Sequence, residues 1–389
     1  MKFKTFFIGG FECADIINNQ GNRVDLLAQT AHDAKIIQDY KLLADAGIKT
    51  VREGIRWSVV ETKPFVYDFT EVKNRIDAAQ QTGIQQLWDI CHFGYPEGLM
   101  PTHPQFAHRL SELCKAFTNL YRNYSDDPLI ITPINEISFI SWLGGEARGT
   151  VPFAVNAGFD LKYFLCKAAI KSIEAIKTID PAAQIMMVEP LIRVHPKMGE
   201  ETCEAITGFN EAQFQAMDII TGRMCPELGG QPQYMDLAGF NFYYNNQWEH
   251  CGEVLGWCEE KRRSCFSELL HNAYLRYDVP VVLSETGHFG EHKAAWMELI
   301  TNDCIKAINK GVDLRGICIY PVLDRPDWDN PDYLIPCGIW SYDDSKERTV
   351  DHEYLLTVQK CHDSIQSHIL KRENKISSIE SLPRIFNYV

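Results

Sequence analysis

The chain has 389 residues, of which 45% are hydrophobic, and it carries a formal net charge of −14 at pH 7. An acidic chain is a poor partner for nucleic acid or an anionic membrane surface, and no run of 18 or more apolar residues predicts a transmembrane helix. The length suits one large α/β barrel as well as two smaller domains.

Eight short apolar runs predict parallel β-strands that are covered on both faces. The first run follows a basic N-terminus that resembles a signal peptide, but the apolar stretch is too short for one. We therefore expect a strand there and a cytoplasmic protein. In chain order the predicted strands are Phe6–Gly10, Thr50–Gly54, Gln85–Cys91, Leu129–Ile134, Gln184–Val188, Leu237–Phe242, Val281–Ser284 and Gly316–Tyr320.

Amphipathic segments between these runs predict helices. The first, Ala31–Ala46, has Thr30 as its expected N-cap and Gly47 as its stop. The other helices are expected at Glu71–Thr82, His108–Tyr124, Leu161–Thr178, Glu200–Thr221, Phe266–Arg276, Glu291–Lys310 and His352–Leu370.

Strands that alternate with helices predict a single-domain (β/α)8 TIM barrel over residues 1–370, followed by a C-terminal tail, 371–389. Two long loops are expected at Ser138–Gly158 and Tyr243–Arg263, and both follow strand ends, where substrate walls lie. No Gly-x-Gly-x-x-Gly follows the first strand, so the pattern does not favour dinucleotide binding.

Two glutamates stand at the ends of predicted strands, about 150 residues apart. Glu136 ends the run Leu-Ile-Ile-Thr-Pro-Ile-Asn-Glu, and Glu285 lies in Leu-Ser-Glu-Thr-Gly. A single glutamate in such a place is usually a solvated loop residue. Two at matching strand ends of a barrel predict a general acid and a nucleophile for chemistry on a glycosidic bond.

The other strand ends carry groups that suit a sugar, since aromatic faces stack on sugar rings and polar groups bind hydroxyls. No lysine stands at a strand end, which argues against a Schiff-base aldolase. No His-x-His motif occurs, which argues against a metal-dependent barrel hydrolase. The 13 cysteines show no metal-type spacing, so we expect no metal, no cofactor and no disulfide framework. The candidate substrate-binding residues are Glu12, Arg52, His92, Asn135, Tyr243, Tyr320, Asp327 and Trp328, with Glu189, Asn241 and Asp324 also close to strand ends.

Six segments, in the right order, resemble those of family 1 glycoside hydrolases, the β-glucosidase family, or of a close relative among the retaining (β/α)8 glycosidases. Asn135-Glu136-Ile137 matches Asn-Glu-Pro, Ser284-Glu285-Thr286-Gly287 matches Thr-Glu-Asn-Gly, and Gly239-Phe-Asn-Phe-Tyr243 is similar to Gly-Ile-Asn-Tyr-Tyr. The remaining three segments are Val51–Ser58, His92–Leu99 and Tyr320–Trp328.

The resemblance implies an acid/base role for Glu136 and a nucleophile role for Glu285. It also implies that Arg52 and Tyr243 lie beside Glu285, and that His92 and Asn135 bind sugar hydroxyls. The chain departs from the family at three places. The family's sugar-binding Gln near the first strand is not evident, and Glu12 is the nearest polar candidate. Tyr320 stands in place of a Trp, and Arg325-Pro326-Asp327-Trp328 stands in place of Asn-Phe-Glu-Trp. These changes predict altered sugar recognition around an intact catalytic pair.

The predicted function is retaining hydrolysis of a β-linked glycoside, with a carbohydrate as the only expected partner. A transglycosylase that uses the same residues and an inactive carbohydrate-binding barrel remain as alternatives. We expect an unphosphorylated sugar, because the carboxylate of Asp327 would repel a phosphate dianion, although the guanidinium of Arg325 would attract one. The sequence indicates neither the sugar, nor the aglycone, nor the oligomeric state.

Overall fold

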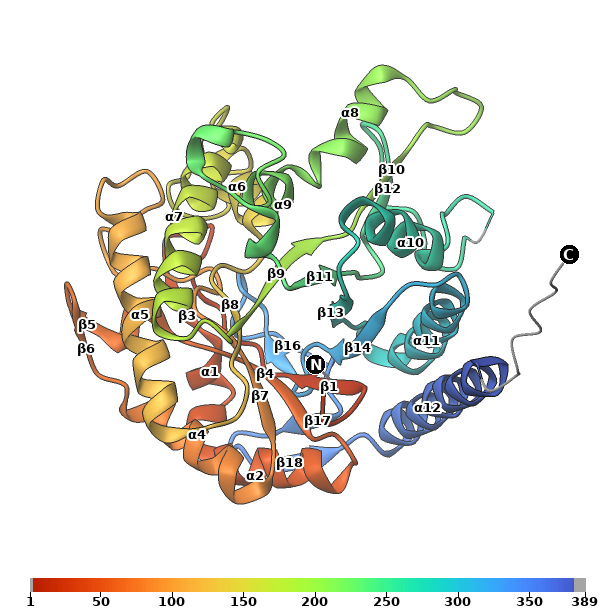
Figure 1. Cartoon of the computed structure of the whole chain (residues 1–389), viewed down its shortest axis with the longest axis horizontal. Coiled ribbons are helices and arrows are strands. Elements are labelled where there is room, and N and C mark those ends of the chain that lie inside the picture. Colours follow the sequence, from red (N-terminus) through yellow and green to blue (C-terminus); the bar gives the residue numbers. More distant parts are fainter. Residues whose placement is uncertain (1–2, 260, 381–389) are drawn as a thin grey trace, which may run out of the picture.

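The computed structural model describes residues 3–259 and 261–380, and its eight central strands close into a parallel barrel (Figure 1). Hydrogen-bonded neighbours follow the order β1-β14-β13-β11-β9-β8-β7-β4, and β4 pairs with β1 to close the ring. This confirms the predicted (β/α)8 barrel. The strands are β1 (Phe7–Gly10), β4 (Thr50–Gly54), β7 (Gln85–Asp89), β8 (Ile130–Thr132), β9 (Gln184–Pro190), β11 (Leu237–Asn241), β13 (Val281–Thr286) and β14 (Leu314–Ile319), and each overlaps a predicted one.

Helices surround the strands as an outer layer (Figure 1). Helix α5 shows why they pack there: Phe106, Leu110, Leu113, Phe117 and Tyr121 recur at helical spacing and are all buried. The helices of this layer are α2 (His32–Asp45), α4 (Thr70–Thr82), α5 (Phe106–Tyr124), α7 (Gly158–Ile179), α9 (Gln215–Ile220), α10 (Phe266–Tyr277), α11 (Lys293–Asn309) and α12 (His352–Glu380).

The barrel interior is a packed core of its own. One side chain or more from most of the barrel strands points inward, and together they form a buried cluster separate from the larger one between strands and helices. The interior cluster consists of Phe3, Ile8, Leu87, Ile130, Met186, Val188, Leu237, Val282, Cys318 and Tyr320. Tyr320 lies just past the end of β14, so this core supports the mouth where the strands end.

Four predictions about local structure need correction. Thr30 does not cap α2, whose N-cap is Ala31; its hydroxyl instead donates to the carbonyl of Leu26, the first residue of α1 (Leu26–Gln29). The predicted loop Ser138–Gly158 begins as helix α6 (Ile137–Gly145), which ends against the start of α7: a Cβ at Gly145 would lie 2.8 Å from the Gly158 backbone.

The other two corrections concern helix ends. The span predicted as one helix, Glu200–Thr221, is two helices, α8 (Glu204–Ala212) and α9, separated by a turn. Helix α12 runs ten residues past its predicted end at 370, so the expected tail begins within a helix. Residues 381–389 of that tail lie outside the described residues.

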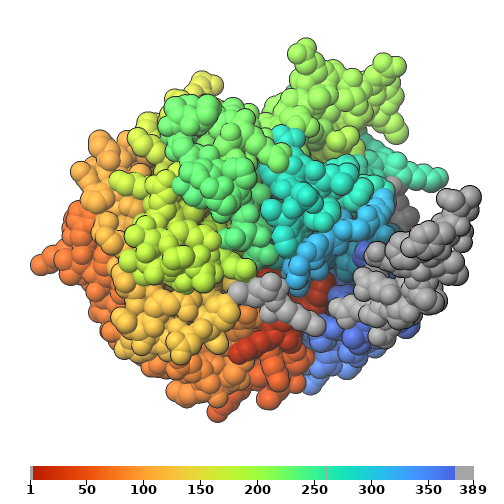
Figure 2. All heavy atoms as spheres, viewed as in Figure 1, coloured from red at the N-terminus to blue at the C-terminus, as the bar shows by residue number. Residues whose placement is uncertain are grey.

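Short strands and helices lie in the connections between the barrel strands and the outer helices. Figure 2 shows the yellow-green segment around α8 standing out from the rest of the surface. No helix in the described ranges has both the length and the apolarity needed to cross a bilayer. The short elements are β2 (Asp15–Ile17), β3 (Arg23–Asp25), α3 (Trp57–Val60), β5 (Glu61–Lys63), β6 (Val66–Tyr67), β10 (Arg193–His195), η1 (Pro226–Leu228), η2 (Pro232–Tyr234), β12 (Gln247–Glu249), η3 (Gly290–His292), β15 (Arg325–Pro326), β16 (Leu334–Ile335), β17 (Trp340–Tyr342) and β18 (Arg348–Val350).

Candidate active site

Buried polar side chains meet at the carboxyl ends of the barrel strands. In a parallel barrel these ends open on one face, so residues distant in sequence become neighbours there. Most of the residues predicted from strand ends lie in this group, and each is at most 9% exposed. They are Glu12, Arg52, His92, Asn135, Glu136, Glu189, Asn241, Glu285 and Tyr320, and the hydroxyl of Tyr243 joins them.

Glu285, on β13, is held by two donors. Nη1 of Arg52 lies 2.5 Å from one carboxylate oxygen, and the hydroxyl of Tyr243 donates to the other over 2.7 Å. Both are the residues that the resemblance implies beside the nucleophile, and together they hold both oxygens of this carboxylate. The arrangement presents a fixed, charged oxygen at the mouth of the barrel.

Arg52, on β4, is the centre of this network. Its Nη2 donates to Asn135 over 2.7 Å and pairs with Asp89 at the end of β7, and its Nη1 also donates to the carbonyl of Ser284. Every one of these partners is buried, so the planar guanidinium fixes the relative places of strands β4, β7 and β13 and of the segment after β8.

Glu136 stands between β8 and α6 in a left-handed backbone conformation, with φ of 46°. Such a conformation is strained for a residue with a side chain and is held here by the bond from its N–H to the Val188 carbonyl. Burial, followed by the charge of Glu285, raises the pKa of Glu136 to about 8, while the Asn241 amide acts in the opposite direction. The site thus holds one carboxyl in an ion pair with Arg52 and a second, buried carboxyl with a raised pKa.

Glu189, on β9, supports the helix that follows Glu136. Its carboxyl oxygens accept from the N–H of Ser138, 3.0 and 3.3 Å away, in the first turn of α6. Burial raises the pKa of Glu189 to about 7. A carboxyl at a helix N-terminus satisfies a free backbone donor and so fixes where α6 starts.

A second cluster is joined to Arg52 through Asp89 and Asn135. His92 receives its orientation from Asp89, which is 3.0 Å from Nδ1. Its Nε2 faces Asn135 and the hydroxyl of Tyr320, each at 3.3 Å, and Glu12 at 3.7 Å. Asp89 had no place in the sequence prediction, although it ends a buried strand three residues before His92.

In the loop after β14, Asp327 and Arg325 each have a partner within the chain. Asp327 Oδ1 accepts from the backbone N–H groups of Asp329 and Asn330, so this carboxylate caps its own loop. Arg325 lies instead beside Glu12, with 3.5 Å between its Nε and a carboxylate oxygen. Glu12 is thus the acid that the segment after β1 contributes to the second cluster, 3.7 Å from His92 and 3.3 Å from the Tyr320 hydroxyl.

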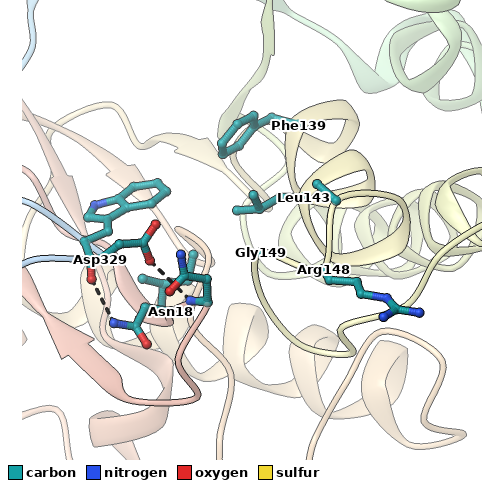
Figure 3. A pocket seen from close by; sticks show the side chains of 10 residues that line it. Asn18, Phe139, Leu143, Arg148, Gly149 and Asp329 are labelled. Carbon is teal, nitrogen blue, oxygen red and sulfur yellow. Dashed lines mark hydrogen bonds between the residues drawn. The ribbon is translucent and has the colours of Figure 1, made fainter.

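Trp328 forms one wall of a cavity of 270 Å³ beside the site (Figure 3). Its ring lies 6.3 Å from that of Phe139, one turn of α6 beyond Glu136, and Figure 3 shows Phe139 and Leu143 on the side of the cavity opposite Asn18 and Asp329. The loop keeps its place through the bond from the Asn18 amide to the Trp328 carbonyl. The cavity adjoins helix α6, whose N-cap is Glu136.

Metal-type donors come together at one place among the described residues: Cys13, Asp89 and His92 hold donor atoms within 4.8 Å of one another. None of the 13 cysteines, all of which lie in the described ranges, is in a disulfide.

The class of fold is thus a (β/α)8 barrel with paired glutamates at its mouth, and comparison with known proteins agrees with it. No family model and no curated protein matches the chain. Among solved structures it is similar to the family 1 β-glucosidase of Thermotoga maritima, with a TM-score of 0.70, 14% identity and coverage of 87% of each chain. Complexes of the Thermotoga maritima β-glucosidase match equally, with glucoimidazole (TM-score 0.69, 16% identity, 86% and 88% covered) and with cyclophellitol (0.69, 16%, 86% and 87%). The chain therefore has the barrel fold of the family 1 β-glucosidases.

Proposed function

We propose that this protein is a retaining β-glycosidase in which Glu285 is the nucleophile and Glu136 the acid/base. The observation that carries the proposal is that the two carboxyl groups have opposite electrostatic surroundings. Glu285 is paired with Arg52 and Tyr243, whereas burial and the neighbouring charge keep Glu136 protonated near neutral pH. Two carboxyls in different protonation states are what a double displacement needs.

The reaction would proceed in two steps. Glu136 gives its proton to the leaving oxygen while an oxygen of Glu285 attacks the anomeric carbon and forms a glycosyl-enzyme. Once the aglycone has left, Glu136 is ionised, takes a proton from water, and the hydroxide displaces Glu285 with net retention. The structural neighbours bind glycosidase inhibitors, which supports a carbohydrate as the substrate of this chain as well.

The sugar would be bound by the second cluster. His92, Asn135, Glu12 and Tyr320 offer both donors and acceptors at hydrogen-bonding distance from one another, an arrangement that suits vicinal hydroxyls. We propose an unphosphorylated sugar, as predicted, but for a different reason. The charge of Arg325 is already paired with Glu12, so little is left to attract a phosphate.

The proposal is tested by a screen of aryl β-glycosides in gluco, galacto, fuco, manno, xylo and 6-phospho forms, with Glu285→Gln as the matched control. We expect turnover of at least one unphosphorylated glycoside with a β-configured first product, and loss of that turnover in the variant. An acceptor alcohol added to the same assay separates hydrolysis from transglycosylation. An enzyme that hydrolyses none of the set, or a variant as active as the wild type, would contradict the proposal.

A further inference from the structure

Glu136 occupies the N-cap position of α6 but does not cap the helix. Its backbone is in the left-handed region, with φ of 46°, and its side chain makes no capping hydrogen bond to the first turn. An N-cap side chain usually accepts a hydrogen bond from the second or third N–H of its helix. A carboxyl engaged in that bond would be turned back onto α6, so Glu136 is free for proton transfer only if another group accepts from this N–H.

Glu189 supplies the acceptor from the neighbouring strand β9. Its two carboxyl oxygens lie 3.0 and 3.3 Å from the backbone nitrogen of Ser138, the second residue of α6. The carbonyl of Val188, one residue earlier in β9, accepts from the Glu136 N–H over 3.0 Å. Two consecutive residues of one strand therefore hold the backbone just before and just after the side chain of Glu136.

The direction of the Glu189 side chain excludes direct contact with a substrate inside the barrel. Successive side chains of a strand point to opposite faces, and Val188 belongs to the buried cluster inside the barrel. Glu189 therefore points outward to the helix layer, where it is 1% exposed and meets the start of α6. Any effect of Glu189 on a reaction at the mouth would pass through Glu136.

The bond from Ser138 does not require a charge on Glu189. Burial raises the pKa of Glu189 to about 7, although hydrogen bonding from Ser138 and the charge of Lys162, on α7, act in the opposite direction. A protonated carboxyl keeps an acceptor oxygen, and so does the amide of glutamine. Glutamine should therefore replace Glu189 in this role, whereas methionine and leucine, which fill a similar volume, offer no comparable acceptor.

We infer that Glu189 is a positioning residue for Glu136: it takes the capping bond at the start of α6 and leaves the carboxyl of Glu136 available for proton transfer. The consequence for catalysis rests on the proposed function. The consequence for the place of the Glu136 carboxyl does not, so the two can be tested separately.

The opposite end of α6 provides the matched control. Glu146, the C-cap residue of α6, accepts from the backbone N–H groups of Asn156 and Gly158 at the start of α7. Glu146→Met therefore removes a bond of the same kind from the same helix, at the end remote from Glu136. The decisive comparison is between Glu189→Met and Glu189→Gln, because both remove the charge and only methionine removes the acceptor. Glu189→Leu is a second variant without an acceptor, and circular dichroism shows whether each variant is folded.

The first test needs no catalysis: backbone hydrogen exchange at Ser138 and ¹³C titration of the Glu136 carboxyl in the full-length chain. In Glu189→Met and Glu189→Leu, exchange at Ser138 should be about thirtyfold faster than in Glu189→Gln, since its N–H has lost its partner. The pKa of Glu136 should fall further toward 4.5 than in Glu189→Gln, because its carboxyl leaves its buried place. Equal exchange and an equal pKa of Glu136 in the methionine and glutamine variants would overturn the inference.

The second test measures kcat/KM on aryl β-glycosides of different leaving groups. Glu189→Met should lose about thirtyfold more on poor leaving groups than on dinitrophenyl glycosides, which need little protonation, while Glu189→Gln loses at most about threefold on either. Glu146→Met should match the wild type on both. A loss in Glu189→Met that is independent of the leaving group, or the same pattern in Glu146→Met, would show a general structural role and overturn the inference. The expected exchange and titration results in a chain whose wild type hydrolyses no glycoside would contradict only the proposed function.

Discussion

The protonation of Glu136 is the property most directly open to perturbation. Its pKa is raised from 4.5 to about 8, with burial as the largest cause and Glu285 as the second. Burial therefore contributes more to this elevated pKa than the charge of Glu285 does. Replacement of Glu285 by Gln removes that charge and keeps the shape, so we expect the pKa of Glu136 to fall by about one to two units.

The measurement is a ¹³C titration of the side-chain carboxyls in Glu285→Gln, with the Glu136 signal assigned by its loss in the double variant with Glu136→Gln. Glu189→Gln is the control, because Glu189 is a smaller contributor to the same shift and its loss should lower the pKa of Glu136 by less. An unchanged pKa in Glu285→Gln, or a larger fall in Glu189→Gln, would refute the account of how the two glutamates interact.

Four further predictions follow from the same geometry. The folded chain holds a proton on Glu136 that the unfolded chain releases above pH 4.5, so the stability of the folded state falls as the pH rises toward 8. Glu136→Gln should therefore raise the free energy of unfolding, measured by urea titration, by about 2–4 kcal/mol at pH 8 and by little at pH 4. Glu136→Ala should slow glycosides with poor leaving groups by at least a hundredfold more than activated aryl glycosides, with azide restoring turnover as a β-glycosyl azide; equal losses without rescue would remove the acid/base role. Turnover should be unaffected by a chelator or a reductant, and inactivation by either would show a metal or disulfide requirement. An aryl β-glycoside should have a higher kcat/KM than its 6-phosphate, and the reverse order would show that Arg325 attracts the phosphate despite Glu12.

Much of the fold was predictable because it depends on local patterns. Runs such as Val281–Ser284 are apolar on both faces, and Gly83 and Gly311, with φ of 71° and 97°, end helices in a conformation that glycine adopts without strain. Helix α6 was missed; it ends at Gly145, where a Cβ would lie 2.8 Å from the Gly158 backbone, a tertiary approach that no window of sequence displays.

The site was predictable where a residue type and a strand end coincide, as for Glu136, Glu285 and Arg52. It was not predictable where the chain folds back on itself. Asp327 Oδ1 accepts from two backbone N–H groups of its own loop, and Cys13 meets Asp89 and His92 only because β1 and β7 both neighbour β4 in the barrel. A carboxylate or thiol has many possible partners in sequence, and the packing of the barrel selects among them.

The central claim is that Glu285 attacks the anomeric carbon. A 2-fluoro β-glycoside of the preferred sugar, with an activated leaving group, should inactivate the enzyme and leave one glycosyl group on Glu285, identified by mass spectrometry of the proteolytic peptides. The same reagent should leave Glu285→Gln unlabelled. A label on Glu136, Glu12 or any other residue, or inactivation without a covalent adduct, would contradict the assignment.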